Sequence, residues 1–233
     1  MGSNTIIEIT EDNLCKITTK NEKGIKINKY VTFNTMLSLL NASLSEEHYD
    51  EDKSNIILSD ILPGDSMVST IQVKEILSSN SKWYVLLREK VPANINLKGK
   101  IFKNVAMPRT LYAIKVCNNK CVSFRIACVK EGQIKNRTTI YRYPYSNVFD
   151  TRSVCLGGNS ISDFTLNDLS NIVMIPEMFL AMINNNDGYA GSNSSGLKYE
   201  ELLEVMENSK FDEDILVESY NTVTYEEFIK NLR

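Results

Sequence analysis

The sequence contains a single histidine, His48, and this scarcity argues against hydrolases in which a histidine base activates the nucleophile. A Cys–His or Ser–His hydrolase would need His48 as its base, but the residue lies in a polar stretch, 45–50, that nothing links to a nucleophile. A surface histidine is therefore the favoured interpretation. A zinc site would depend on Cys117 and Cys121, with no second ligand pair, so we expect no metal. Glycine-rich phosphate-binding motifs are also missing, and no organic cofactor is expected.

Long apolar runs are missing as well. The most apolar stretch, 172–183, is too short to span a bilayer and contains Pro176 and Glu177. The first residues show no basic head followed by an apolar run, so we expect no secretory signal and no membrane association. The five cysteines are odd in number and scattered, which argues against a disulfide framework. We therefore predict a cytoplasmic protein.

Charge of one sign dominates only the end of the chain. Lysine and arginine number 26 and aspartate and glutamate 29, a net charge of −3. From Glu200 onward the balance is −7, which leaves +4 for the preceding 199 residues. A nucleic-acid binder shows a much stronger basic face, so this pattern does not favour nucleic acid as a partner.

What the chain does have is the composition of a globular protein. Its 233 residues are 42% hydrophobic, enough for one or two domains with a real core. The runs of strand length and strand composition are 67–73, 83–88, 111–116, 121–129 and 138–143. Asn118 and Asn119 favour a hairpin turn, and Val122, Phe124, Ile126 and Cys128 should share one apolar face. Short connections of this kind predict an antiparallel β-meander.

Helical signals follow Cys155. The pattern predicts a helix start at 165–168, a helical segment over 172–183 that restarts at Pro176, and helices over 199–208 and 224–232. The stretch 184–196, rich in Asn, Gly and Ser, predicts a loop. Strands followed by helices indicate an α+β fold.

The domain assignment has two parts. Residues 61–233 are expected to form the main domain, with acidic C-terminal helices. Residues 1–60 are expected to be an N-terminal extension, with strands at 5–9 and 15–18 and a helix at 32–40. The sequence leaves open whether this extension completes the same domain or forms a separate docking element.

Cys155 has the surroundings of a functional cysteine. It follows the last predicted strand, lies in a turn-rich segment near Arg152, and precedes Gly157 and Gly158. A loop thiol beside a cation can be accessible and activated. The alternative is a partly buried cysteine beside a tight turn, and the residues themselves leave both interpretations open.

A family resemblance centres on the same segment. It is similar to the active-site segment of ubiquitin-conjugating (UBC) enzymes, in which a His-Pro-Asn motif precedes the catalytic cysteine by eight residues. Asn147 and Cys155 have this separation. The match is closer to prokaryotic ubiquitin-conjugating-like family D, typified by protein B of the PRTRC plasmid system. Its Pro-aromatic-x-Asn-Val and Val-Cys-x-Gly segments match 144–148 and 154–157. The motif's histidine is absent, and Tyr145 or Ser146 stands near its place.

The resemblance covers residues 65–185 and implies a UBC-like fold with a β-meander, an active-site loop and helices. It further implies that Cys155 accepts a ubiquitin-like protein from a ThiF-like activating enzyme as a thioester and transfers it to a protein acceptor. Asn147 would be the oxyanion donor, and Asp150 or Asp163 would orient the incoming amine. The supporting residues around the loop would be Tyr145, Arg152 and Gly157.

Other interpretations stay open at this point. A catalytically silent UBC-like domain could act as a binding scaffold in a plasmid or defence operon, and a maintenance factor of a mobile element could act through protein or DNA contacts. The 184–196 loop could border the cleft and touch donor or acceptor, or be a plain surface loop.

Overall fold

The computed structural model describes residues 5–9, 14–20, 26–32, 55–156, 169–218 and 224–233. The chain divides into two compact units, 1–54 and 55–233. In the first, β1 (Thr5–Ile9), β2 (Leu14–Lys20) and β3 (Lys26–Thr32) form an antiparallel sheet in that order. The strands predicted at 5–9 and 15–18 are thus confirmed. Residues 33–40 of the predicted helix, and His48, lie outside the described residues.

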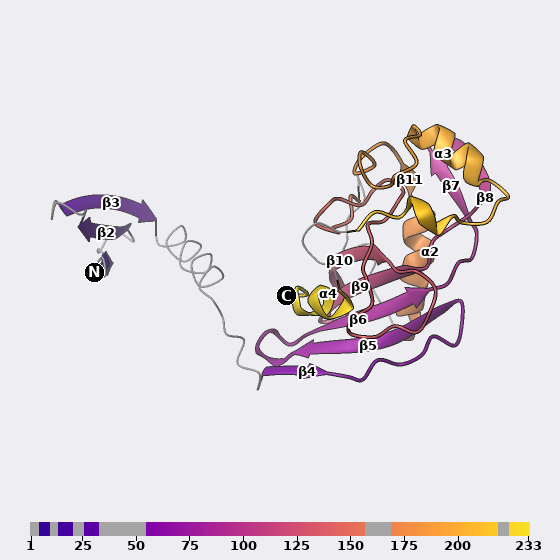
Figure 1. Cartoon of the computed structure of the whole chain (residues 1–233). Helices are drawn as coiled ribbons and strands as arrows, with labels where there is room; N and C mark the ends of the chain where they lie inside the picture. Colours follow the sequence, from indigo (N-terminus) through magenta and orange to yellow (C-terminus); the bar gives the residue numbers. More distant parts are fainter. Residues whose placement is uncertain (1–4, 10–13, 21–25, 33–54, 157–168, 219–223) are drawn as a thin grey trace. The chain divides into compact units, whose positions relative to one another are not determined.

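The second unit is built on a five-stranded antiparallel sheet (Figure 1). Its order is β10-β9-β6-β5-β4, so strands adjacent in this sheet follow one another along the chain apart from one insertion. The strands are β4 (Ile56–Leu58), β5 (Val68–Ile76), β6 (Ser81–Arg88), β9 (Thr110–Cys117) and β10 (Lys120–Cys128). The predicted antiparallel meander is confirmed, and four of the five predicted runs correspond to β5, β6, β9 and β10.

The β9–β10 hairpin turns at Asn118 and Asn119, whose φ angles are 50° and 59°. Asparagine tolerates this left-handed backbone, as the sequence indicated. Phe124 and Cys128 are buried, but Val122 is 46% exposed. The expectation that Val122 shares their face is wrong, because the strand pairing shifts between Cys121 and Ser123 and turns its side chain outward.

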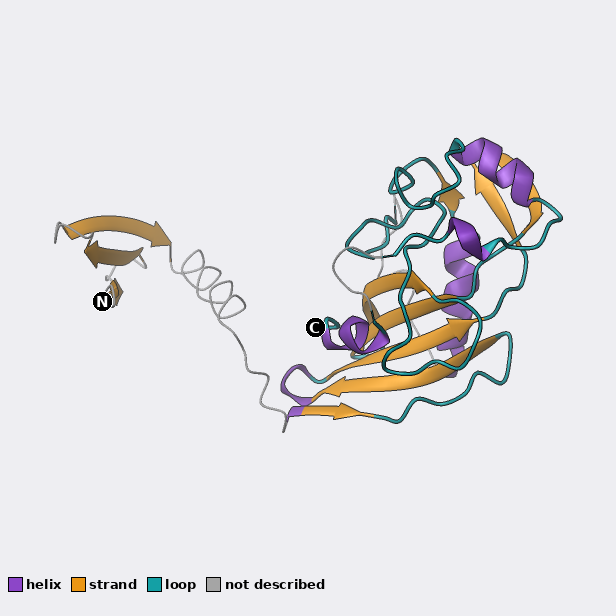
Figure 2. Cartoon of the chain, in the orientation of Figure 1, coloured by secondary structure: helices purple, strands orange, loops and turns teal. Residues whose placement is uncertain are grey.

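Each face of the sheet is covered by a helix (Figure 2). On one face, α2 (Ile175–Leu180) buries Phe179 among core residues that include Tyr112 and Phe124. On the other, α4 (Tyr225–Lys230) buries Phe228 in a cluster with residues of β5, β6 and β9. A 3-10 helix, Leu169–Met174, precedes α2, and Pro176 lies in the first turn of α2, so the predicted restart is confirmed. The helix ends at Leu180, however, so the predicted helical segment is wrong over 181–183.

An inserted hairpin carries a second sheet. The strands β7 (Ala93–Leu97) and β8 (Lys100–Val105) pair antiparallel, and β11 (Ile183–Asn184) runs parallel to β7. The helix α3 (Tyr199–Met206) lies beside β8 (Figure 1). These strands were not predicted, whereas α3 was.

The strand predicted over 138–143 is wrong. Thr139 and Tyr141 make only isolated bridges, and these go to three different partners, Cys128, Glu218 and Thr224. Without one continuous partner strand no ladder forms. The predicted helix start at 165–168 lies outside the described residues. In the described part of the chain, no helix combines the length and apolar character needed to cross a bilayer. The architecture is α+β, rich in sheet.

Candidate functional site

A tight turn leads into Cys155. Val148 and Val154 face each other across an isolated bridge, and between them Phe149 and Ser153 close the turn through an N–H···O bond of 2.9 Å. The segment also runs beside β10, since the Ile126 amide donates to the Arg152 carbonyl at 2.9 Å. The turn is therefore held by hydrogen bonds on both sides. Cys155, which directly follows it, is partly exposed.

Asn147 links this turn to a distant loop through its main chain. Its carbonyl accepts from the Cys155 amide at 2.7 Å, and its amide donates to the Asp187 carbonyl at 2.7 Å. Its side chain is buried, and Nδ2 donates to the Ile183 carbonyl at 3.3 Å. Asn147 thus bonds both to Cys155 and to the loop after α2, and fixes the position of the loop relative to the cysteine.

Asp187 brings a carboxylate to the thiol. The Cys155 Sγ donates to Asp187 Oδ2 at a separation of 3.6 Å. Asn185 Nδ2 donates to the same oxygen at 2.8 Å, and the Asp187 amide donates back to Asn185 Oδ1 at 2.6 Å. The loop predicted over 184–196 therefore lies against Cys155. Asp187 was not among the predicted site residues, and the only signal for it was an Asp-Gly pair within that loop.

Gly188 lets the two segments approach closely. Its φ is +72°, and a Cβ at this position would overlap the backbone carbonyl of Val148. Only glycine satisfies both conditions, because it has no Cβ and adopts positive φ at little cost. The neighbouring Asp187 is placed against Cys155 by this contact.

Gly188→Ala is expected to destabilise the protein by about 1–3 kcal/mol. The backbone must shift away from the Val148 carbonyl, and alanine must also adopt a positive φ. Gly196→Ala is the matched control: its φ is +71°, but an added Cβ would meet only open space. Chemical denaturation of both variants separates the two effects. Equal losses of unfolding free energy would show that the Val148 contact contributes nothing beyond the left-handed backbone.

The supporting residues predicted from the sequence have separate surroundings. Tyr145 is fully buried, its hydroxyl donates to the Ala106 carbonyl, and burial raises the pKa of its phenol well above the usual range. Asp150 has a side chain that is 70% exposed and pairs with Arg142. Arg152 is buried with a φ of 67°. Gly157 and Asp163 lie outside the described residues.

The other described cysteines differ from Cys155. Cys121 and Cys128 are buried in the core, and burial raises the pKa of the Cys121 thiol to about 11 and that of Cys128 further. A raised thiol pKa disfavours the nucleophilic thiolate. Cys117 is partly exposed but ends a strand at a hairpin. Among Cys117, Cys121, Cys128 and Cys155, the cysteines whose side chains the structure describes, only Cys155 combines partial exposure with a carboxylate at the thiol.

Comparison with known proteins gives one result. The model of the family described as Prokaryotic E2 family D matches residues 57–219, which includes Cys155, Asn147 and Asp187. No curated protein matches the chain, and no solved structure does.

Proposed function

Because this chain belongs to prokaryotic E2 family D and is thus a ubiquitin-conjugating-like protein, we propose that it carries a ubiquitin-like protein as a thioester on Cys155. The observation that supports this most directly is the partly exposed Cys155, whose main-chain amide donates to the Asn147 carbonyl and whose thiol faces the carboxylate of Asp187. Within this proposal, the unit 55–233 is the UBC-like domain and residues 1–54 are the N-terminal extension. The boundary lies a few residues before the one expected at 60/61, because β4 pairs with β5 in the sheet of the second unit.

The first step is charging of Cys155. Its thiolate attacks the thioester that joins the ubiquitin-like protein to an activating enzyme. A new C–S bond forms to Cys155, the old C–S bond breaks, and the sulfur of the activating enzyme leaves as a thiolate. The thioester keeps the acyl group reactive, because a thiolate is a good leaving group.

The second step is transfer to an acceptor amine on a protein. The amine nitrogen attacks the thioester carbonyl, a C–N bond forms, the C–S bond breaks, and Cys155 leaves as a thiolate. We assign to Asp187 the orientation of the incoming amine and the acceptance of its proton, because its carboxylate lies 3.6 Å from Sγ. Asp150 is the weaker candidate, since its carboxylate pairs with Arg142.

Negative charge develops on the carbonyl oxygen during this attack, and a fixed N–H donor would stabilise it. We assign this role to the side-chain amide of Asn147. One N–H of Nδ2 donates to the Ile183 carbonyl, which fixes the orientation of the amide, and the second N–H is the proposed oxyanion donor.

Mapping the attachment site tests the proposal. The protein is mixed with ATP, a ThiF-like activating enzyme and its ubiquitin-like protein, and the adduct is analysed by gel and by peptide mass spectrometry without reductant. We expect a reductant-sensitive adduct on Cys155. An activating enzyme that becomes charged but passes nothing to this protein would favour a binding scaffold instead.

A further inference from the structure

The side-chain amide of Asn184 is buried beside the candidate site and is hydrogen-bonded at both ends. Its Oδ1 accepts from the Ser146 hydroxyl at 2.9 Å and from the Tyr199 hydroxyl at 3.1 Å, and its Nδ2 donates to the Met182 carbonyl at 3.0 Å. A carbonyl can only accept, so the Met182 contact fixes which end of the amide faces the two hydroxyls. Asn184 therefore ties two other segments of the chain, at Ser146 and at Tyr199, to β11.

The residues next to this contact carry the proposed chemistry. Asn147 follows Ser146 in the chain, and Ile183 precedes Asn184. Because Asn147 Nδ2 donates to the Ile183 carbonyl at 3.3 Å, this bond and the Ser146–Asn184 bond connect the same two segments. The position of β11 therefore sets where the Ile183 carbonyl lies, and with it the direction of the second N–H of Asn147.

The strand β11 is too short to hold this position by its ladder alone. It has two residues, Ile183 and Asn184, and each pairs with one residue of β7. The Lys98 amide also donates to the Asn184 carbonyl at 3.2 Å. Elements with few hydrogen bonds open locally at low free energy. The side-chain bonds of Asn184 add to this small ladder, and they help to hold the Ile183 carbonyl in place.

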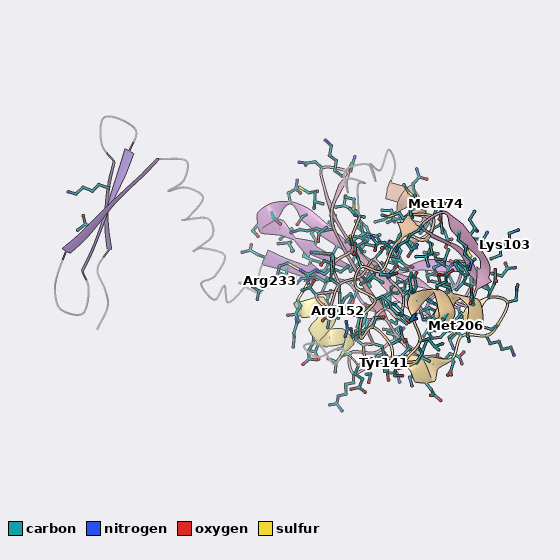
Figure 3. The ribbon with its side chains drawn as sticks, turned by 90° about the horizontal axis from the view of Figure 1, so that it is seen from above. Lys103, Tyr141, Arg152, Met174, Met206 and Arg233 are labelled. Atoms are coloured by element: carbon teal, nitrogen blue, oxygen red, sulfur yellow. The ribbon has the colours of Figure 1, made fainter. Side chains whose placement is uncertain are left out.

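Tyr199 supplies a rigid anchor for the amide of Asn184. It is the first residue of α3, the helix whose last residue, Met206, is labelled in Figure 3. Its side chain is buried, and its ring centroid lies 4.8 Å from that of Tyr189 and 6.5 Å from that of Tyr145. Burial raises the pKa of the Tyr199 phenol to about 12, so the hydroxyl keeps its proton and stays a donor at neutral pH.

We propose that Asn184 is a positioning residue for the transfer step, and that the hydroxyls of Ser146 and Tyr199 hold its amide. Asn184 acts through its neighbours: it keeps β11 against the Asn147 segment, and so keeps the Asn147 amide directed at the developing oxyanion. A displacement of about 1 Å at such a group can slow a reaction by about a hundredfold. The inference depends on the proposed function, since it concerns the support of the same oxyanion donor.

The test is single-turnover discharge of the charged protein by free lysine over a range of lysine concentrations. Tyr199→Phe removes one hydroxyl and keeps the ring in its aromatic contacts. We expect the limiting rate constant to fall about three- to tenfold, the usual effect of one lost hydrogen bond, while the lysine concentration at half-maximal rate changes by less than about twofold. Ser146→Ala removes the other hydroxyl and should have an effect of the same size.

Tyr189→Phe is the matched control for Tyr199→Phe. The Tyr189 ring packs on that of Tyr199, but its hydroxyl donates to the Leu197 carbonyl at 2.7 Å. This variant therefore loses a hydroxyl from the same aromatic pair and leaves the bonds of Asn184 in place. Its limiting rate constant should stay within about twofold of the wild-type value. Thermal melting curves show whether each variant is folded.

A double-mutant cycle with Asn147 separates positioning from a purely structural role. If Tyr199 acts through Asn147, Tyr199→Phe should change the discharge rate of Asn147→Gly by less than about twofold, because the amide that it positions is already gone. The same three- to tenfold loss in both backgrounds would show that the effect does not pass through Asn147, and would overturn the inference.

Two further outcomes would overturn the inference while the proposed thioester chemistry stands. One is a wild-type discharge rate in both Tyr199→Phe and Ser146→Ala. The other is a wild-type rate in Asn147→Gly, since there would then be no oxyanion donor to position. Failure of the wild-type protein to become charged would instead defeat the proposed function, and this inference with it.

Discussion

Cys155→Ala is expected to remove all reductant-sensitive adduct, whereas Cys117→Ala should charge as the wild-type protein does. Both cysteines are partly exposed, but only Cys155 faces a carboxylate and carries the main-chain bond to Asn147. Alanine removes the nucleophile altogether, so no residual charging is expected. Cys155→Ser should give a stable oxygen ester that survives reductant and is cleaved by alkali. Non-reducing gels and hydroxide treatment distinguish these species.

A reductant-sensitive adduct that persists in Cys155→Ala would contradict the assignment of the nucleophile. Loss of the adduct in Cys117→Ala alone would move the active thiol to the β9–β10 hairpin. Circular dichroism of the variants excludes unfolding as the cause of either result.

Asp187→Asn is expected to slow transfer to lysine by about a hundredfold while charging changes by less than about threefold. Asparagine is nearly the same size and its oxygen can still accept from Asn185, so the loop geometry should be preserved. What is lost is the negative charge that orients the amine and takes its proton. Single-turnover discharge of the isolated thioester by free lysine measures this step separately from charging.

Asp150→Asn is the matched control for Asp187→Asn. Asp150 is an exposed carboxylate in the turn that leads into Cys155, and its partner is Arg142 rather than the thiol. We expect its discharge rate to stay within about twofold of wild type. Equal effects of the two substitutions would show that net charge, and not the placement of Asp187, governs transfer.

Local sequence signals predicted much of this fold because they act over a few residues. Thr224 and Glu227 stand in capping-box spacing, and both reciprocal bonds are present at the start of α4. Asn118 and Asn119 supply the left-handed backbone that the β9–β10 turn requires. The exposure of Val122 was not predictable, because a shift in strand pairing leaves no mark in an alternating pattern.

The candidate site was predictable only in part, for a related reason. Asn147 and Cys155 were found because they lie in one short motif, but Asp187 is 32 residues beyond Cys155 in sequence. Its placement depends on Gly188 packing against Val148, a long-range contact that no local pattern reports. The hairpin of β7 and β8 escaped prediction because its strands are short and interrupted by asparagine and lysine.

The left-handed backbone of Asn147 limits how its chemistry can be dissected by mutagenesis. Its φ is 65°, a conformation that glycine adopts freely, asparagine and aspartate tolerate, and other residues adopt at a cost of about 1–2 kcal/mol. Alanine scanning at this position would therefore report backbone strain together with any loss of oxyanion stabilisation. Glycine deletes the side-chain amide without that strain, so the comparison of Asn147→Gly with Asn147→Ala separates a catalytic contribution from a conformational one.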